Sequence, residues 1–171
     1  MEKCLYLHKN KLYIRFISNE KQYPVDMTKK DNNIILLPIK NIEEHIEFLY
    51  ELLNARKHNI SHEKIPSFNE HRLFVDNHPY REWYLIEENN KFVGSLYIAN
   101  NNAIGINILS NSKSIIKKSI EWVSINKNPL PGIKSLRSNY FHINVSPENK
   151  VLIKALNDMK APPVEVTYLI K

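Results

Sequence analysis

The 171-residue chain has one cysteine, Cys4, and only three glycines. A single thiol can neither close an internal disulfide nor build a cysteine-based zinc site. The seven histidines do not replace it, because His58 and His62, and likewise His71 and His78, lack the companion residues of a metal-binding helix. The sequence therefore predicts no metal site.

Long apolar runs are also missing. No window of the chain approaches the roughly 18 uncharged apolar residues that a membrane-spanning helix needs. The first eleven residues carry charges inside their first apolar stretch, which is unlike the core of a signal peptide. We therefore expect a cytoplasmic protein that makes no membrane contact.

The composition is that of one folded domain, with 43% hydrophobic and 25% charged residues. Twenty-four Lys and Arg against 18 Asp and Glu give a formal net charge of +6. Nucleic-acid-binding domains cluster such charges with exposed aromatics, whereas here only Lys117 and Lys118 stand out on an expected helix. A nucleic-acid-binding domain, whose affinity for nucleic acid would fall steeply with salt, is therefore a weaker interpretation than an enzyme or a protein that binds another kind of ligand.

The first quarter of the chain is rich in β-forming residues. Residues 4–17 form two such runs around the polar Lys9–Lys11, which predicts a hairpin, and residues 20–33 read as a polar loop. Residues 34–39 are a short apolar run that suits a buried strand. Two arrangements stay open for the hairpin: it extends the main sheet, or it pairs with the strand edge of another subunit in a homodimer.

Two capping boxes predict the first two helices. Asn41 stands three residues before Glu44, and apolar residues at helical spacing continue to about Ala55. Ser67 and Glu70 form the second box, which opens a short helix that ends before the next proline.

Three segments of β-forming residues follow, at 81–88, 91–99 and 103–109, and asparagine-rich turns separate them. This spacing predicts an antiparallel meander. Gly94 and Gly105 lie inside these strands, where glycine indicates a bulge or the close approach of other atoms.

The last third of the chain alternates helices and strands. We expect a helix over 112–125, a loop over 127–138, a strand over 140–145, a helix started by Ser146 and Pro147, and a final strand over 164–170.

This order of elements predicts an α+β fold, with a mixed, mainly antiparallel central sheet flanked by helices. Residues 1–32 would form an N-terminal β-hairpin extension, and residues 33–171 the main domain.

Three stretches of the main domain carry a family resemblance: residues 59–71, residues 78–86, and the run Asn144-Val-Ser-Pro-Glu-Asn149. Together with the order of elements, they make the main domain resemble the GNAT superfamily of acyl-CoA-dependent N-acyltransferases. The first two are similar to segments that precede the central meander in a bacterial subgroup of that superfamily, and the third resembles the asparagine-rich turn before its last helix. The similarity covers roughly residues 33–171 and implies both the GNAT fold and acetyl-CoA, or another acyl-CoA, as co-substrate.

In that superfamily a splayed strand offers backbone groups to the pantetheine arm. The next loop, Gln/Arg-x-x-Gly-x-Gly/Ala, turns N–H groups toward the pyrophosphate at a helix N-terminus. Alignment of Ile104–Leu109 with that strand puts Asn111, Ser114 and Ile116 where the loop has Gln/Arg, Gly and Gly/Ala, so this motif is degenerate here. The co-substrate contacts implied by the resemblance are Ile106, Ile108, Asn111, Lys113, Ser114 and Asn149.

The second half of the family pattern is also altered. Leu156 lies near the position of a family tyrosine that protonates the leaving thiolate, and Lys160-Ala161 replaces a Gly-Phe pair. Asn144 and Asn149 are retained, although Asn149 also has a complete explanation as a helix cap.

Transfer to an amine needs a base, because only the free amine attacks a thioester. The candidates are His62, His71, His78 and His142, of which we select His62 and His142; His71 is expected on the surface of its helix. The resemblance and the strand pattern suggest His62, Tyr84 and Asn144 as substrate contacts.

The sequence thus favours transfer of an acetyl or related acyl group from acyl-CoA to a primary amine of a small molecule, such as an amino sugar or an amino acid. The alternative is a catalytically inactive protein of the GNAT fold that binds a ligand or a protein, or one that accepts a different donor.

Overall fold

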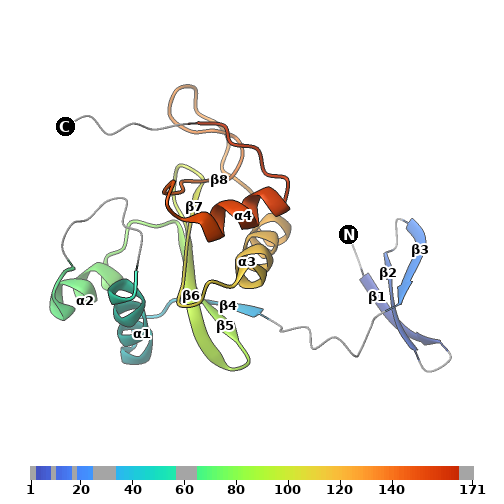
Figure 1. The fold of residues 1–171 in the computed structure, drawn as a ribbon, viewed down its shortest axis with the longest axis horizontal. Helices are drawn as coiled ribbons and strands as arrows, with labels where there is room; N and C mark the ends of the chain where they lie inside the picture. Colours follow the sequence, from blue (N-terminus) through green and yellow to red (C-terminus); the bar gives the residue numbers. More distant parts are fainter. Residues whose placement is uncertain (1–2, 9–10, 17–18, 25–33, 57–64, 166–171) are drawn as a thin grey trace. The chain divides into compact units, whose positions relative to one another are not determined.

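The computed structural model describes residues 3–8, 11–16, 19–24, 34–56 and 65–165. Its contacts divide the chain into two compact units, Met1–Asn32 and Asn33–Lys171, which are described separately (Figure 1).

The first unit is a three-stranded antiparallel sheet. It consists of β1 (Lys3–His8), β2 (Lys11–Phe16) and β3 (Asn19–Pro24), in the order β1-β2-β3. The predicted hairpin is confirmed. The loop expected from residue 20 is wrong over β3, because a polar segment can form an outer strand on backbone hydrogen bonds alone.

The second unit is built on a five-stranded sheet with the order β4-β5-β6-β7-β8. Its strands are β4 (Ile34–Pro38), β5 (Glu82–Glu88), β6 (Lys91–Ile98), β7 (Ala103–Ile108) and β8 (His142–Ile143). The first four pair antiparallel, which confirms the predicted meander, and β8 runs parallel to β7. The strand expected over 140–145 shrinks to the two residues of β8.

In the part of the chain that the structure describes, four helices cover the sheet: α1 (Glu43–Asn54), α2 (Phe68–Asp76), α3 (Lys113–Asn126) and α4 (Lys150–Asp158). α1 and α2 lie on one side of the sheet, and α3 and α4 lie on the other (Figure 1). The molecule is therefore the α+β fold that the sequence predicts, with a mixed and mainly antiparallel sheet between helices.

The helix starts follow the predicted chemistry only in part. The Ser67–Glu70 capping box is present at α2. At α1 the cap residue is Ile42, and the side chain of Asn41 instead donates to Asp76 Oδ1 at 2.6 Å, so the first predicted box is wrong. At α4 the cap is Asn149 rather than Ser146 and Pro147.

Two other expectations need correction. β4 is not a buried strand, because it lies at the edge of its sheet: Leu36 is 6% exposed and Ile35 is 48% exposed. The strand expected over 164–170 is not formed at residues 164–165, and its remaining residues lie outside the described part of the chain.

Apolar cores form on both sides of the sheet. On the α1 and α2 side, Ile46 and Leu49 pack against Val75 and Leu85. On the other side, one cluster joins the strands to α3, and another joins Ile116 and Ile120 of α3 to Leu152 and Ala155 of α4. Because α3 and α4 contact each other directly, they hold the segment after β7 and the segment after β8 together.

Candidate functional site

β7 and β8 pair over only two residues and then separate. Ala103 lies opposite His142, and Ile104 lies opposite Ile143. β7 continues to Ile108 without a β8 partner, while the chain after Ile143 leaves the sheet. The two parallel strands therefore diverge immediately after Ile104.

The divergence exposes one edge of the β7 backbone. Leu109 N–H donates to Val93 O, and Ala103 O accepts from Ala99 N–H, so the odd-numbered residues of β7 bond toward β6. Because backbone groups alternate between neighbours in an antiparallel ladder, those of Ile106 and Ile108 point the other way. Within the described residues no β8 strand residue pairs with either. These are the two strand residues that the sequence assigns to the co-substrate.

His142 lies at the point where the strands separate. Its neighbour Ile143 packs among the side chains on the α3 and α4 side, so His142 points to the opposite face of the sheet. Its Nδ1 is buried and has no hydrogen-bond partner in the described structure. An imidazole nitrogen without a protein partner is available for a hydrogen bond with a bound group.

Asn102, which the sequence analysis overlooked, holds His142 in place. Its backbone oxygen accepts from His142 N–H at 3.2 Å, and its fully buried side chain donates to Leu130 O and Ser138 O at 2.9 and 2.8 Å. Its Oδ1 accepts from Leu130 N–H. The residue has a φ of 68°, which asparagine tolerates better than most residues do. The asparagine-rich turn was the available signal.

Aromatic rings cover the same face beside His142. Tyr97 lies opposite Gly105, and a Cβ atom at Gly105 would overlap its ring. Tyr80 stacks on Tyr97 with ring centroids 3.9 Å apart. Burial, together with the neighbouring Tyr97, raises the pKa of Tyr80 to about 12, so its hydroxyl stays protonated at neutral pH. The glycine thus marks a close contact, as its position in the strand predicted.

The N-terminus of α3 is occupied by the protein's own groups. Ser112 Oγ accepts from Ile115 N–H at 3.4 Å. Lys113 Nζ lies 3.0 Å from Asp158 Oδ2, at the end of α4. The side chain of Ile116 is buried in the contact with α4, so it does not stand over the loop. Ser114 is exposed, as is Asn111.

The remaining candidates are scattered over the fold. Asn149 Oδ1 accepts from Leu152 N–H as the cap of α4, and Asn144 is exposed just after β8. His71 is 4% exposed rather than on the surface, and a nitrogen of its ring bonds Ile46 O. Burial lowers the pKa of His71. His62 lies outside the described residues.

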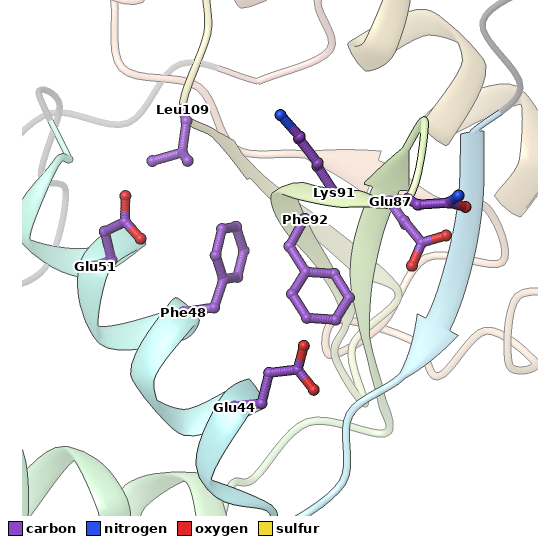
Figure 2. Close-up of a pocket in the computed structure, with 8 residues that line it drawn as sticks. Glu44, Phe48, Glu51, Glu87, Lys91, Phe92 and Leu109 are labelled. Atoms are coloured by element: carbon purple, nitrogen blue, oxygen red, sulfur yellow. The ribbon is translucent and has the colours of Figure 1, made fainter.

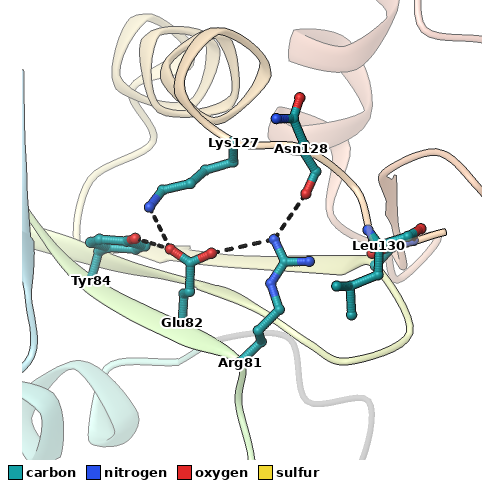
Figure 3. Close-up of polar contacts among 7 residues, drawn as sticks. Arg81, Glu82, Tyr84, Lys127, Asn128 and Leu130 are labelled. Atoms are coloured by element: carbon teal, nitrogen blue, oxygen red, sulfur yellow. Dashed lines mark hydrogen bonds and ion pairs between the residues drawn. The ribbon is translucent and has the colours of Figure 1, made fainter.

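Tyr84 lies on the α3 side of the sheet, in a network around Glu82 (Figure 3). The Tyr84 hydroxyl donates to Glu82, which also pairs with Lys127 Nζ at 2.5 Å and with Arg81 Nη2 at 3.3 Å. Arg81 donates further to Asn128 O. Tyr84 thus has a structural partner, and it lies on the opposite face from His142.

A separate hollow of about 340 Å³ lies between α1 and the β5–β6 turn (Figure 2). Phe48 and Phe92 line it, and their ring centroids are 5.4 Å apart. The carboxylates around it belong to Glu44, Glu51 and Glu87. Leu109 borders it, so the hollow lies toward the far end of β7 from His142.

In the described part of the chain, no group of three or more His, Cys, Asp or Glu side chains could hold a metal ion. No described helix is both long enough and apolar enough to cross a membrane.

The chain has structural neighbours among the solved structures. No family model and no curated protein matches the chain. The crystal structure of aminoglycoside N-acetyltransferase AAC(6')-Ib11 matches with 15% sequence identity and a TM-score of 0.47, over 75% of this chain and 84% of that one.

Proposed function

We propose that the protein transfers an acyl group from acetyl-CoA, or from another pantetheine thioester, to a primary amine. The observation that supports this most strongly is the divergence of β7 and β8. It leaves the backbone groups of Ile106 and Ile108 at an open edge, where they can bind the amides of an extended arm.

The side chains around this edge fit the needs of acyl transfer. A thioester supplies an activated carbonyl carbon, and the protein must orient it and manage one proton. An N–H of the open edge polarises the carbonyl oxygen. His142 Nδ1 accepts the proton that the amine loses, and Asn102 fixes the position of the β8 backbone that carries it.

The rings of Tyr80 and Tyr97 form the wall on which an acceptor would rest, since aromatic faces bind apolar surface and cations. The hollow beside Phe48 stands outside this proposal, because Leu109 and Ile104 are separated by five residues of strand, roughly 16 Å. An amino sugar or an amino acid remains the proposed class of acceptor.

The test is the release of free thiol from acetyl-CoA and from acetyl-pantetheine, measured with a panel of primary amines. His142→Gln should lower kcat at least tenfold, while Glu148→Gln, at an exposed position in the following loop, should keep most of the rate. No amine-dependent thiol release from either donor would contradict the proposal.

A second experiment tests the open edge directly. Proline at Ile108 removes an outward N–H and spares the ladder to β6, whereas Ile108→Ala loses a similar side chain and keeps the N–H. We expect Ile108→Pro to lower kcat/KM well below the value for Ile108→Ala at matched folded fraction. Equal values would remove the edge from the mechanism.

One observation favours a non-catalytic binding protein instead. The contact between α3 and α4 is apolar. Lys113, at the start of α3, already pairs with Asp158, so the protein's own groups occupy the place where the diphosphate of an acyl-CoA donor would bind. If thermal stability rises with acetyl-CoA but no thiol is released with any amine, the binding role is the better description.

A further inference from the structure

The surface formed by α3 and α4 is rich in lysine. The two helices carry five lysines and two carboxylates: Lys113, Lys117, Lys118, Lys150, Lys154, Glu121 and Asp158. Across the sheet, α1 carries four glutamates and no lysine or arginine. The helices on the two sides of the sheet therefore carry opposite charge, and the basic helices α3 and α4 are the ones that follow β7 and β8, the strands that diverge.

The lysines surround a single carboxylate at the contact between the helices. Asp158 pairs with Lys113 at 3.0 Å, and the positive charges of Lys117 and Lys154 also lie close enough to favour its ionised form. Both Asp158 and Lys113 are about 40% exposed, so this cluster is open to solvent; the side-chain exposures are 41% and 39%.

This arrangement is poorly suited to binding the diphosphate of coenzyme A. A diphosphate at the start of α3 would compete with Asp158 for Lys113, and like charges in contact repel. The loop before α3 has no glycine, and Ser112 already satisfies Ile115 N–H. The binding of a free nucleotide by helix N-terminal amides is therefore weakened, while the positive charge spread along two helices is kept.

Charge spread in this way fits a macromolecule better than a small anion. Lys113 and Lys117 are four residues apart on α3, and Lys150 and Lys154 are four apart on α4, so each pair presents its charges along a helix. Such rows complement a partner helix that carries carboxylates, and they guide its approach through long-range attraction.

We propose that the acyl donor is a thioester on the pantetheine arm of an acidic carrier protein, which docks its acidic helix on the lysines of α3 and α4. This inference rests on the proposed acyl transfer and names its donor. The carrier's C–S bond breaks as the C–N bond forms, giving an amide and the carrier's free thiol. The amine loses one proton to His142, and the leaving thiolate takes up one proton from the protonated His142, directly or through water.

The probe is the acidic acyl carrier protein of bacterial fatty-acid synthesis, in its phosphopantetheine form and loaded with an acetyl group. We expect it to bind with an affinity that falls at least tenfold between 50 and 200 mM salt. Its thioester should give a higher kcat/KM than acetyl-CoA at equal concentration.

Charge reversal at the patch supplies the matched variants. Lys117→Glu with Lys154→Glu should weaken carrier binding at least tenfold, and the milder pair of glutamine substitutions should weaken it less. Lys134→Glu reverses an exposed lysine in the loop before β8 and should change it less than twofold. Unfolding curves of each variant exclude loss of the fold.

Asp158→Asn tests the patch with the opposite change of charge. Lys113, Lys117 and Lys154 lie around this carboxylate, so its removal should tighten carrier binding and make that binding fall more steeply with salt. Unchanged or weaker binding would contradict docking at these lysines.

The outcomes are distinct. Thiol release from acetyl-CoA without carrier binding would overturn this inference and keep the proposed function. If the substitutions at Lys117 and Lys154 leave carrier binding unchanged, the carrier binds elsewhere on the protein, and this inference is also overturned. Failure of every thioester would overturn both proposals.

Discussion

The ring of Tyr97 covers Gly105 on the neighbouring strand so closely that no side chain can be added there without displacing the ring. Gly105→Ala should therefore lower the free energy of unfolding by about 1–3 kcal/mol. Urea denaturation measures this loss. Gly132→Ala is the comparison variant: its nearest heavy atom is an Asn139 Cβ at 3.3 Å, which has to move by only a few tenths of an ångström, so the loss should be clearly smaller than at Gly105.

A smaller residue at position 97 should rescue the glycine variant. Tyr97→Leu combined with Gly105→Ala should recover part of the stability, because the clash requires both side chains. Strict additivity of the two losses would contradict the close contact.

The two predicted capping boxes differ in the structure, and mutation should show the difference. Ser67→Ala removes a side chain that caps α2 and should cost about 1 kcal/mol, within a range of about 0.5–2. Asn41→Ala removes only an exposed hydrogen bond to Asp76 and should cost less than about 0.5 kcal/mol. Thermal unfolding of both variants tests this, and equal losses would contradict the assignment of the caps.

Stability should depend on acid through Glu82. Burial raises the pKa of the Glu82 carboxyl, but hydrogen bonds from Lys127 and Tyr84 outweigh burial and leave the pKa below its ordinary value of 4.5. The unfolded chain therefore binds this proton more readily than the folded chain does. The contribution of Glu82 is complete above pH 4.5 and is lost as the pH falls through the folded-state pKa.

Glu82→Gln removes this titration and leaves a residue of the same size. Its unfolding free energy should be lower than wild type by about 1–3 kcal/mol at neutral pH. Below about pH 4.5 the two proteins should converge. A constant gap down to about pH 3 would show that the carboxylate charge is not the source of the stability.

Ser119 is fully buried on α3, and its Oγ has no partner in the described structure. Ser119→Ala should raise the free energy of unfolding by about 1 kcal/mol, because it removes an unpaired hydroxyl and inserts a better helix former. Ser124 on the same helix donates to Ile120 O, so Ser124→Ala should give a smaller gain. Chemical denaturation of the two variants tests this prediction. A lower free energy of unfolding for Ser119→Ala would show that the Ser119 hydroxyl has a hydrogen-bond partner.

Asn102 joins the β6–β7 turn to the loop before β8. Asn102→Gly keeps the positive φ accessible and removes three side-chain hydrogen bonds, so it should cost about 2–4 kcal/mol. Asn100→Ala, in the same turn, loses one exposed bond at 3.3 Å and should cost less than about 0.5 kcal/mol. Similar losses would show that the turn, and not this amide, holds the loop.

Local patterns in the sequence were enough to predict most of the sheet and the helices. Asparagine turns separated three strands that do pair as a meander, and the Ser67 box marked the start of α2. The prediction failed where a side chain bonds a residue that is far away in the sequence. Asn41 bonds Asp76, 35 residues away, instead of capping α1, and no local rule could foresee that contact.

The candidate site was harder to predict, because its parts come from distant segments. The sequence singled out His142 and the two isoleucines of β7, but not Asn102, whose role depends on bonds to residues 28 and 36 positions away. His71 read as a surface residue because Arg72 follows it, yet the packing of α2 against α1 buries it.

Among the described residues only two pairs join β8 to its sheet, so the segment from β8 to α4 depends on side-chain packing rather than on a hydrogen-bonded ladder. In native-state hydrogen exchange, the amides of β8 should therefore lose protection well before those of β5 and β6, which sit in the middle of the sheet. The region that would have to admit an acyl chain is then also one that opens at a lower energetic cost than the middle of the sheet.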